Sequence, residues 1–268
     1  MKTLIQRSFC LYARRISLLV VLSTLLAGVS FSQTRNIYQI KIYSINSEQQ
    51  GQQLDSYLQN AYIPALHRTG IKNVGVFKPV EDEEMAGKEV YVLVPFESIN
   101  QFEQLRANLN KDKKYLKEGA DYHNAAFDNP PYVRIESILL RAFSTMPIYG
   151  IPTHSTAPSE QIYELRSYQG ATEKLYEKKV EMFNEGGESK IFKDLGFQPV
   201  FFGEVISGSE MPNLMYMTSF KDSPSQGEHW KAFISSPDWD KLKTDEQYAN
   251  TVSNIEKILL HPAEYSEL

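Results

Sequence analysis

Hydrophobic and polar residues alternate along two short segments of the chain, YQIKIY at residues 38–43 and YELRSY at residues 163–168. Successive side chains of a β-strand point to opposite faces, so this alternation predicts two strands, each with one apolar and one polar face. The polar faces are formed by Gln39, Lys41 and Tyr43 in the first segment and by Glu164, Arg166 and Tyr168 in the second. The chain therefore contains nearly the same strand twice.

Other landmarks recur in the same order. Tyr38, Gly70, Phe96 and Ile135 correspond to Tyr163, Gly196, Phe220 and Ile255. An ordered recurrence of this kind indicates two copies of one structural unit of about 110 residues.

Each copy predicts the same series of elements. In the first, strands are expected near 37–43, 71–79, 89–96 and 132–142. Apolar residues three or four positions apart, Leu54, Leu58, Ala61 and Ala65, predict a helix that Pro64 should kink or divide. A second helix begins with a capping box at Ser98 and Gln101. In the second copy, Ser236 and Pro237 mark a helix start of the same kind.

The order strand, helix, strand, strand, helix, strand predicts an α+β protein with two tandem ferredoxin-like (βαββαβ) domains. A segment rich in proline and hydroxyl residues separates the copies and reads as a linker. The expected boundaries are 33–147 for the first domain, 148–159 for the linker and 160–268 for the second domain.

The first 32 residues have a different pattern. Basic residues from Lys2 to Arg15 precede the apolar run from Ile16 to Val29, and small residues follow up to Ser32. This order predicts a signal peptide at 1–32, cleaved after Ser32, and a secreted or periplasmic protein. A retained membrane anchor is the alternative, but the run is shorter than the roughly 20 apolar residues that span a bilayer.

The net charge of the chain limits the classes of partner that it is expected to bind. The full chain has a net charge of −5, and removal of the leader takes away basic residues only. An acidic mature chain argues against nucleic acid and against anionic membrane surfaces as partners. The single cysteine, Cys10, lies in the leader, so the mature chain has no thiol nucleophile and no disulfide.

Long, ordered segments carry a family resemblance. The runs IYELRSY, EMFNEGGESKIFKDLGFQPVFFGEVISGSEMPNLMYMTSF and YANTVSNIEKILLHPAEYSEL resemble the bacterial secreted NIPSNAP-type proteins of the dimeric α+β barrel superfamily. NAYIPALHRTGIKNVGVFKP and NPPYVRIESILLRAF extend the likeness to the first copy. The resemblance implies tandem domains whose sheets associate into a barrel, within one chain or between the chains of a homodimer. It supplies no catalytic residue set, although related barrels include cofactor-independent oxygenases and haem-degrading enzymes.

The polar strand faces are the first candidate site. If the apolar faces pack on helices, Glu164, Arg166 and Tyr168 with Gln39, Lys41 and Tyr43 line a shared interior between the two sheets. A carboxylate and a guanidinium on one strand face can clamp a polar ligand whose ring rests on the tyrosines. The alternative is an ion pair that fixes the association of the two sheets.

Three further residues are weaker candidates. Asn184 and Glu185 precede a glycine pair that interrupts a helix. This interruption is either a bend that contacts a ligand or a helix break that shapes the domain. His261 ends the last predicted strand and is a candidate haem ligand or general base. No two histidines have metal-ligand spacing, and no phosphate-binding loop or GxSxG motif is present, so no metal and no cofactor are expected.

Three functions remain open at this point. The first is binding of a small polar or aromatic ligand, or of a protein partner, at the sheet interface. The second is an oxygenase or haem-handling enzyme that uses Tyr168, Arg166 and a histidine. The third is a purely structural association module.

Overall fold

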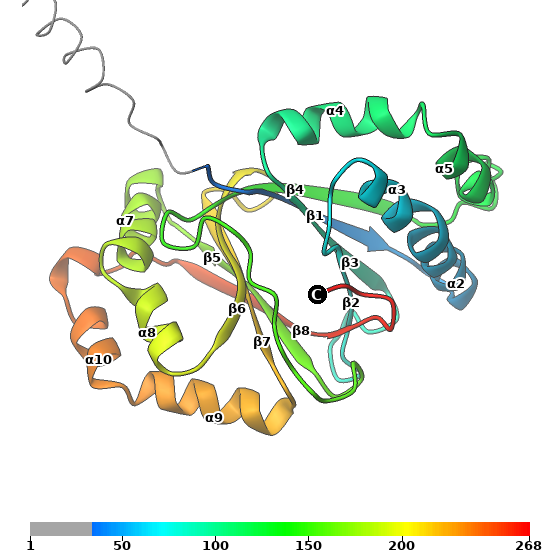
Figure 1. The fold of residues 1–268 in the computed structure, drawn as a ribbon. Helices are drawn as coiled ribbons and strands as arrows, with labels where there is room; N and C mark the ends of the chain where they lie inside the picture. The colour runs from blue at the N-terminus through cyan, green and yellow to red at the C-terminus, as the bar shows by residue number, and fades with distance from the viewer. Residues whose placement is uncertain (1–33) are drawn as a thin grey trace, which may run out of the picture. The chain divides into compact units, whose positions relative to one another are not determined.

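A sheet closed into a barrel organises the part of the chain that the computed structural model describes, residues 34–268 (Figure 1). Its strand order is β1-β3-β2-β8-β5-β7-β6-β4, and every neighbouring pair is antiparallel. The predicted signal peptide and its cleavage site lie outside the described residues.

The first half of the barrel comes from residues before the linker. Its elements are β1 (Ile37–Ser44), α2 (Glu48–Tyr57), the π-helix η1 (Leu58–Tyr62), α3 (Ile63–Arg68), β2 (Gly75–Pro79), β3 (Glu89–Phe96), α4 (Ile99–Leu109), α5 (Lys113–Glu118), α6 (Ala120–His123) and β4 (Arg134–Ala142).

The second half has the same plan. Its elements are β5 (Ile162–Gln169), α7 (Glu173–Asn184), α8 (Glu188–Asp194), β6 (Gln198–Ser207), β7 (Asn213–Phe220), α9 (Ser223–Ile234), α10 (Pro237–Lys243), the 3-10 helix η2 (Glu246–Tyr248) and β8 (Asn254–Pro262). The pairs β2–β8 and β4–β6 join the halves.

The repeat seen in the sequence has a structural counterpart in strand register. Tyr43 lies opposite Ile135 in the β1–β4 pair, and Tyr168 lies opposite Ile255 in the β5–β8 pair. Corresponding landmarks therefore occupy corresponding places in the two halves.

Local signals in the sequence position several helices as expected. Gln101 N donates to Ser98 Oγ at the start of α4, and Trp239 N donates to Ser236 Oγ at the start of α10. Before Pro64 the helix widens into the π-turn η1, in which Ile63 N donates to Leu58 O. Because proline has no N–H to donate, this turn divides the predicted helix without ending it. The second strand starts later than expected, at Gly75, after a turn with Asn73 at φ 56°.

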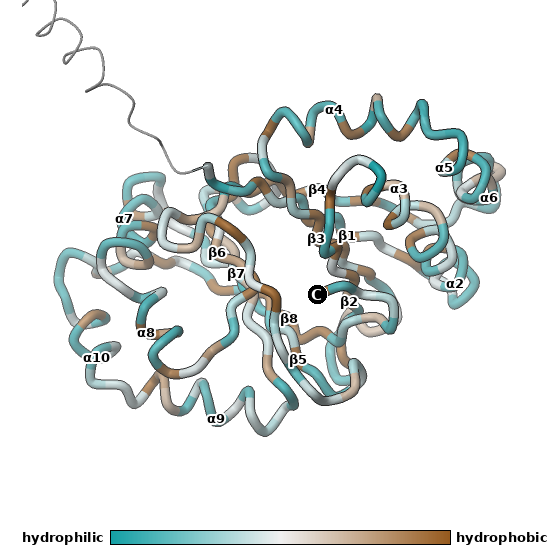
Figure 2. Tube along the Cα trace, in the orientation of Figure 1, coloured by the Kyte–Doolittle hydropathy of each residue, from teal (hydrophilic) through white to brown (hydrophobic). Residues whose placement is uncertain are grey.

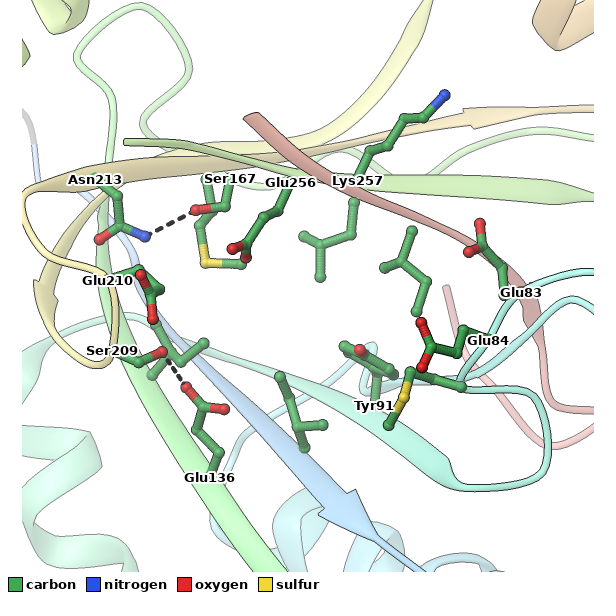
Figure 3. Close-up of a pocket in the computed structure, with 16 residues that line it drawn as sticks. Glu83, Glu84, Tyr91, Glu136, Ser167, Ser209, Glu210, Asn213, Glu256 and Lys257 are labelled. Atoms are coloured by element: carbon green, nitrogen blue, oxygen red, sulfur yellow. Dashed lines mark hydrogen bonds between the residues drawn. The ribbon is translucent and has the colours of Figure 1, made fainter. Parts of the chain in front are cut away.

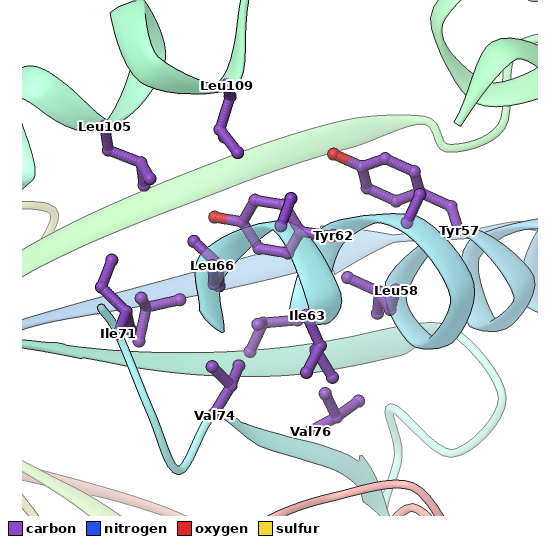
Figure 4. Packing of buried hydrophobic residues seen from close by; sticks show 14 of the residues in the cluster. Tyr57, Leu58, Tyr62, Ile63, Leu66, Ile71, Val74, Val76, Leu105 and Leu109 are labelled. Carbon is purple, nitrogen blue, oxygen red and sulfur yellow. The ribbon is translucent and has the colours of Figure 1, made fainter. Parts of the chain in front are cut away.

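The helices lie outside the barrel in two groups, with the strands between them (Figure 1). Hydrophobic residues concentrate along the strands, and hydrophilic residues along the outer sides of the helices (Figure 2). In the first half, Leu58, Leu66, Leu105 and Leu109 pack from the helices onto the sheet (Figure 4). Among residues 34–268, none of the helices has both the length and the apolar character needed to cross a membrane.

Closure of the sheet reverses one prediction. Tyr38, Ile40 and Leu165 point into the barrel, where they belong to the interior cluster. Tyr43 and Tyr168 belong instead to the two clusters beneath the helices. The prediction that the polar faces line a shared interior is therefore wrong. The reason is physical: a narrow barrel interior must be filled by side chains that need no polar partner, whereas the helices can supply such partners.

Tyr38 tests how strictly this interior excludes polar groups. Its hydroxyl is buried and has no hydrogen-bond partner among the described residues, and burial raises its pKa. Removing the hydroxyl in Tyr38→Phe should leave the free energy of unfolding unchanged or raise it by about 1 kcal/mol, measured by urea denaturation.

Tyr216→Phe is the matched control. This tyrosine is equally buried, but its hydroxyl is hydrogen-bonded to that of Tyr168 at 2.8 Å, so its loss should cost about 1 kcal/mol. A larger loss of stability in Tyr38→Phe than in Tyr216→Phe would contradict the account.

Candidate functional site

The interior of the barrel is filled unevenly along its axis. At one end, aromatic rings from both halves meet: Tyr38 and Phe201 lie 5.1 Å apart between centroids, and Phe77 and Tyr163 lie 4.8 Å apart. At the other end most inward side chains are aliphatic, and Tyr91 is the aromatic residue among them. The closed sheet therefore has one filled end and one end with room for a ligand.

That second end contains a pocket of about 460 Å³ (Figure 3). The apolar side chains that line it are Ile42, Ile138, Leu165, Met215 and Ile258 from β1, β4, β5, β7 and β8, and Met85 from the β2–β3 loop. Both halves of the closed sheet contribute to the pocket. Its size is within the range of small-molecule sites.

Glutamates surround the apolar side chains. Glu83 and Glu84 come from the β2–β3 loop, Glu210 from the β6–β7 loop, and Glu136 and Glu256 from the starts of β4 and β8. We call these five residues the acidic rim. Figure 3 shows Glu136, Glu210 and Glu256 on one side of the pocket and Glu83 and Glu84 on the other.

Several rim carboxylates are held in place. Glu136 accepts a hydrogen bond from Ser209 Oγ, Glu256 accepts one from Gln169 Nε2 at 3.0 Å, and Glu83 accepts one from Leu259 N at 2.9 Å. Glu210 has a φ of 61°, in the left-handed region that residues other than glycine seldom adopt. Such backbone strain occurs most often where a residue must be held in a particular place.

The pocket carries an excess of negative charge. Lys257 is the one basic residue in its wall, and its side chain extends away from the acidic rim (Figure 3). Besides burial, this negative charge contributes to the raised pKa of Tyr91. Its pKa is raised by burial first, then by its hydrogen bond to Glu89, and further by the charges of Glu136 and Glu83. Within residues 34–268, no group of three or more metal-binding side chains is placed to hold a metal ion.

None of the residues proposed from the sequence lines this pocket. Glu164, Arg166 and Tyr168 do come together, but beneath α7 and α9. Glu164 Oε1 accepts from Arg166 Nε at 2.7 Å, and Arg166 Nη1 donates to the Tyr168 hydroxyl at 3.3 Å.

Side chains of α9 supply the remaining partners of Glu164 and Arg166. Glu164 is fully buried, and its Oε2 accepts from Gln226 Nε2 at 2.8 Å and from the indole nitrogen of Trp230. The Arg166 guanidinium lies 3.7 Å from the centroid of the Trp230 ring. Burial raises the pKa of Tyr168, and the nearby guanidinium partly offsets that rise. The ion pair of the alternative interpretation is present, but it joins two residues of β5 and packs on α9, so it does not link two sheets. A role in ligand binding stays a prediction.

The first-half residues are on the opposite side of the molecule. Lys41 donates to the hydroxyl of Tyr43 beneath η1, whereas Gln39 donates to Ser137 Oγ at 2.7 Å near the surface. The two triplets therefore lie under different helices and do not meet.

The remaining candidates hold local structure. Asn184 Oδ1 accepts from Thr145 N at 3.2 Å and ties α7 to the segment between the halves. Glu185 is exposed, at the break that separates α7 from α8, and Gly187 has a φ of 88° there. His261 Nδ1 lies 2.8 Å from Gln161 O. For these three residues also, ligand binding stays a prediction.

Comparison with known proteins identifies one part of the chain. Residues 163–267 match the family model NIPSNAP. These residues form a NIPSNAP domain. No curated protein matches the sequence.

The fold has relatives among solved structures. A protein from Lactobacillus acidophilus, provisionally named a monooxygenase, aligns at 11% identity with a TM-score of 0.58, over 85% of this chain and 94% of its own. A second, from Fusobacterium nucleatum and named in the same way, aligns at 12% identity with a TM-score of 0.53, over 86% and 93%. At such identity the likeness shows the fold alone, a mixed α+β fold.

A NIPSNAP family protein from Agrobacterium tumefaciens covers 44% of this chain and 97% of its own, at 17% identity and a TM-score of 0.36. The domain assignment rests on the sequence match and not on this alignment. The NIPSNAP domain supplies β5, β7 and β8 to the pocket, and the first half supplies the rest.

The ion pair beneath α9 generates a prediction about stability. In Glu164→Gln the neutral amide leaves the Arg166 guanidinium without its counter-charge in a buried place. The free energy of unfolding should fall by roughly 3 kcal/mol, measured by urea denaturation at pH 7.

Glu185→Gln makes the same chemical change at an exposed position and should cost less than about 0.5 kcal/mol. Equal effects of the two substitutions would show that the buried network does not stabilise the fold.

Proposed function

We propose that the protein binds a small organic cation, an amine with an apolar body, in the pocket at the open end of the barrel. The observation that carries the proposal is the combination of aliphatic side chains in the pocket with the acidic rim around it. The sequence predicts a ligand at the sheet interface, and the proposal keeps that ligand. It assigns binding to the residues of the pocket and not to those proposed from the sequence.

Physical chemistry supports a ligand with two parts. The free energy of binding becomes more favourable by about 0.8 kcal/mol for each methylene group of the apolar body that leaves water. The surroundings suit such a group, because Ile138, Leu165 and Met215 are themselves buried and apolar. The charged end remains at the rim, where converging carboxylates attract cations and repel anions. A divalent metal ion fits less well, since no metal-binding cluster was found in residues 34–268.

The architecture of the site is part of the proposal. We propose that residues 33–147 and 160–268 are two ferredoxin-like domains that pair within one chain, joined by the linker 148–159. The strand orders β4-β1-β3-β2 and β8-β5-β7-β6 support this division. The expected location is secreted or periplasmic, as the leader pattern at 1–32 indicates.

An oxygenase activity is not transferred from the related structures. The two structures named as monooxygenases come from proteins that are 11% and 12% identical to this chain. One fold supports many unrelated functions.

Isothermal titration with a matched set of ligands tests the proposal. Hexylamine, hexanol and hexanoate share one alkyl chain and differ in charge. We expect hexylamine to bind most tightly and hexanoate not at all, because only the ammonium group is attracted by the rim. Shortening the amine to butylamine should weaken binding about threefold to fourfold per methylene. Equal affinities for hexylamine and hexanol would contradict the proposal.

Substitution of the rim tests the same site from the protein side. Glu136→Gln and Glu256→Gln should each weaken hexylamine binding about threefold to tenfold at low salt, and less at high salt, because salt screens partly exposed charges.

Glu185→Gln removes the same charge from a residue that does not line the pocket, so it should leave the affinity unchanged. Ile258→Trp should abolish binding by filling the pocket. If the rim variants and the Glu185 variant behaved alike, the ligand would have to bind elsewhere.

A further inference from the structure

Lys41 is a cation without a counter-charge beneath the helices of the first half. Its ammonium nitrogen lies 4.8 Å from the ring centroid of Tyr43 and 4.9 Å from that of Tyr62. Its one side-chain hydrogen bond goes to the Tyr43 hydroxyl. No carboxylate in residues 34–268 forms an ion pair with it.

The corresponding lysine or arginine position in the second half does have a counter-charge. There the corresponding strand position carries Arg166, which pairs with the buried Glu164 at 2.7 Å. The position that corresponds to Glu164 is Gln39 in the first half, and its side chain bonds to Ser137 instead. The repeat therefore keeps the cation in both halves but keeps the carboxylate in only one.

Uncharged phenols surround Lys41. Tyr43 on β1 and Tyr62 on η1 contact it, and Tyr57 on α2, Tyr115 on α5 and Tyr122 on α6 extend the same cluster. Burial raises the pKa of each of these tyrosines, so none supplies a negative charge near neutral pH.

Burial also lowers the pKa of Lys41 to about 8. Half of the amines are then neutral at pH 8, whereas for an ordinary lysine the neutral fraction at that pH is under about 1%. A neutral amine is the nucleophilic form, and lysines activated in this way attack carbonyl carbons.

We propose that Lys41 is a nucleophilic amine that forms an imine with a small aldehyde or ketone whose apolar body lies against the tyrosine rings. Lys41 is partly exposed when the whole residue is counted. A pocket of about 530 Å³ adjoins the cluster and has Tyr122 and Tyr132 in its wall. Tyr132 in turn lies 5.7 Å from Tyr43 between ring centroids.

The chemistry balances without any further reactant. The lone pair of Nζ attacks the carbonyl carbon, a C–N bond forms, and the carbonyl oxygen receives the proton that the nitrogen loses. The Tyr43 hydroxyl, hydrogen-bonded to Nζ, is placed to pass that proton. The nitrogen then gives its remaining proton to the hydroxyl group, which leaves as water while the C=N bond forms, so amine and carbonyl give imine and water. This activity is separate from the cation site, because the Lys41 side chain lies on the helix side of β1, against Tyr62, and does not line the barrel pocket.

Reductive trapping tests the proposal. The mature protein is treated with limiting benzaldehyde and sodium cyanoborohydride from pH 6 to pH 10, and the modified lysines are mapped by peptide mass spectrometry. At pH 7 we expect Lys41 to gain the benzyl group at least tenfold faster than the exposed Lys72, with a half-maximal rate near pH 8.

Lys41→Met should remove the dominant adduct, and Lys72→Met should leave it in place. The fold of Lys41→Met is expected to survive. Because the folded-state pKa is lowered, the charged amine destabilises the fold below pH 8, and this cost fades as the pH rises towards the ordinary value of 10.5. Its melting temperature at pH 7 should therefore not fall below that of the unmodified protein.

Tyr43→Phe keeps the amine and removes the hydroxyl, so trapping should become slower while remaining at Lys41. Labelling of Lys41 no faster than Lys72, or a rate without an inflection near pH 8, would overturn the proposal.

Discussion

Closure of the sheet is the constraint on which the rest of this structure depends. In an open sheet one face can be solvated, but in a closed sheet the inner face of every strand is enclosed, and the helices cover parts of the outer face. The interior is then filled mainly by apolar and aromatic side chains, among them Tyr38, Ile40 and Leu165. Polar groups are confined to the helix side or to the ends of the barrel.

The two polar regions follow from this constraint. On the helix side of the second half, Glu164 finds Arg166, Gln226 and Trp230, and its charge is fully compensated. On the helix side of the first half, Lys41 finds only tyrosines. The same repeated strand has thus become a closed ion-pair network in one half and an uncompensated amine in the other. At the open end of the barrel, glutamates gather around aliphatic side chains, and this combination suits an organic cation.

Much of the fold is predictable from the sequence, because alternation, helix caps and the internal repeat are local signals. The register of Tyr43 with Ile135 and of Tyr168 with Ile255 agrees with the repeat, and the starts of α4 and α10 agree with their capping residues. The choice of face was not predictable in the same way. Alternation separates the residues of a strand into two sets, but only closure decides which set turns inward.

The candidate site was harder still to find. Its glutamates come from two loops and from the starts of two strands, so no spacing along the chain marks them. Its apolar residues look like ordinary core positions. The acidic turn EDEEMAGK was visible in the sequence, but nothing in its pattern showed that it would border the open end of a barrel.

The central claim is that an organic cation binds among the aliphatic side chains at the open end of the barrel. Methyl NMR of protein labelled at isoleucine, leucine and methionine measures this most directly, during titration with hexylamine. The account predicts shifts concentrated at Ile42, Ile138, Leu165, Met215 and Ile258, with the methyls beneath the helices, such as Leu58 and Leu105, unchanged. Shifts confined to the helix side, or none at saturating amine, would contradict it.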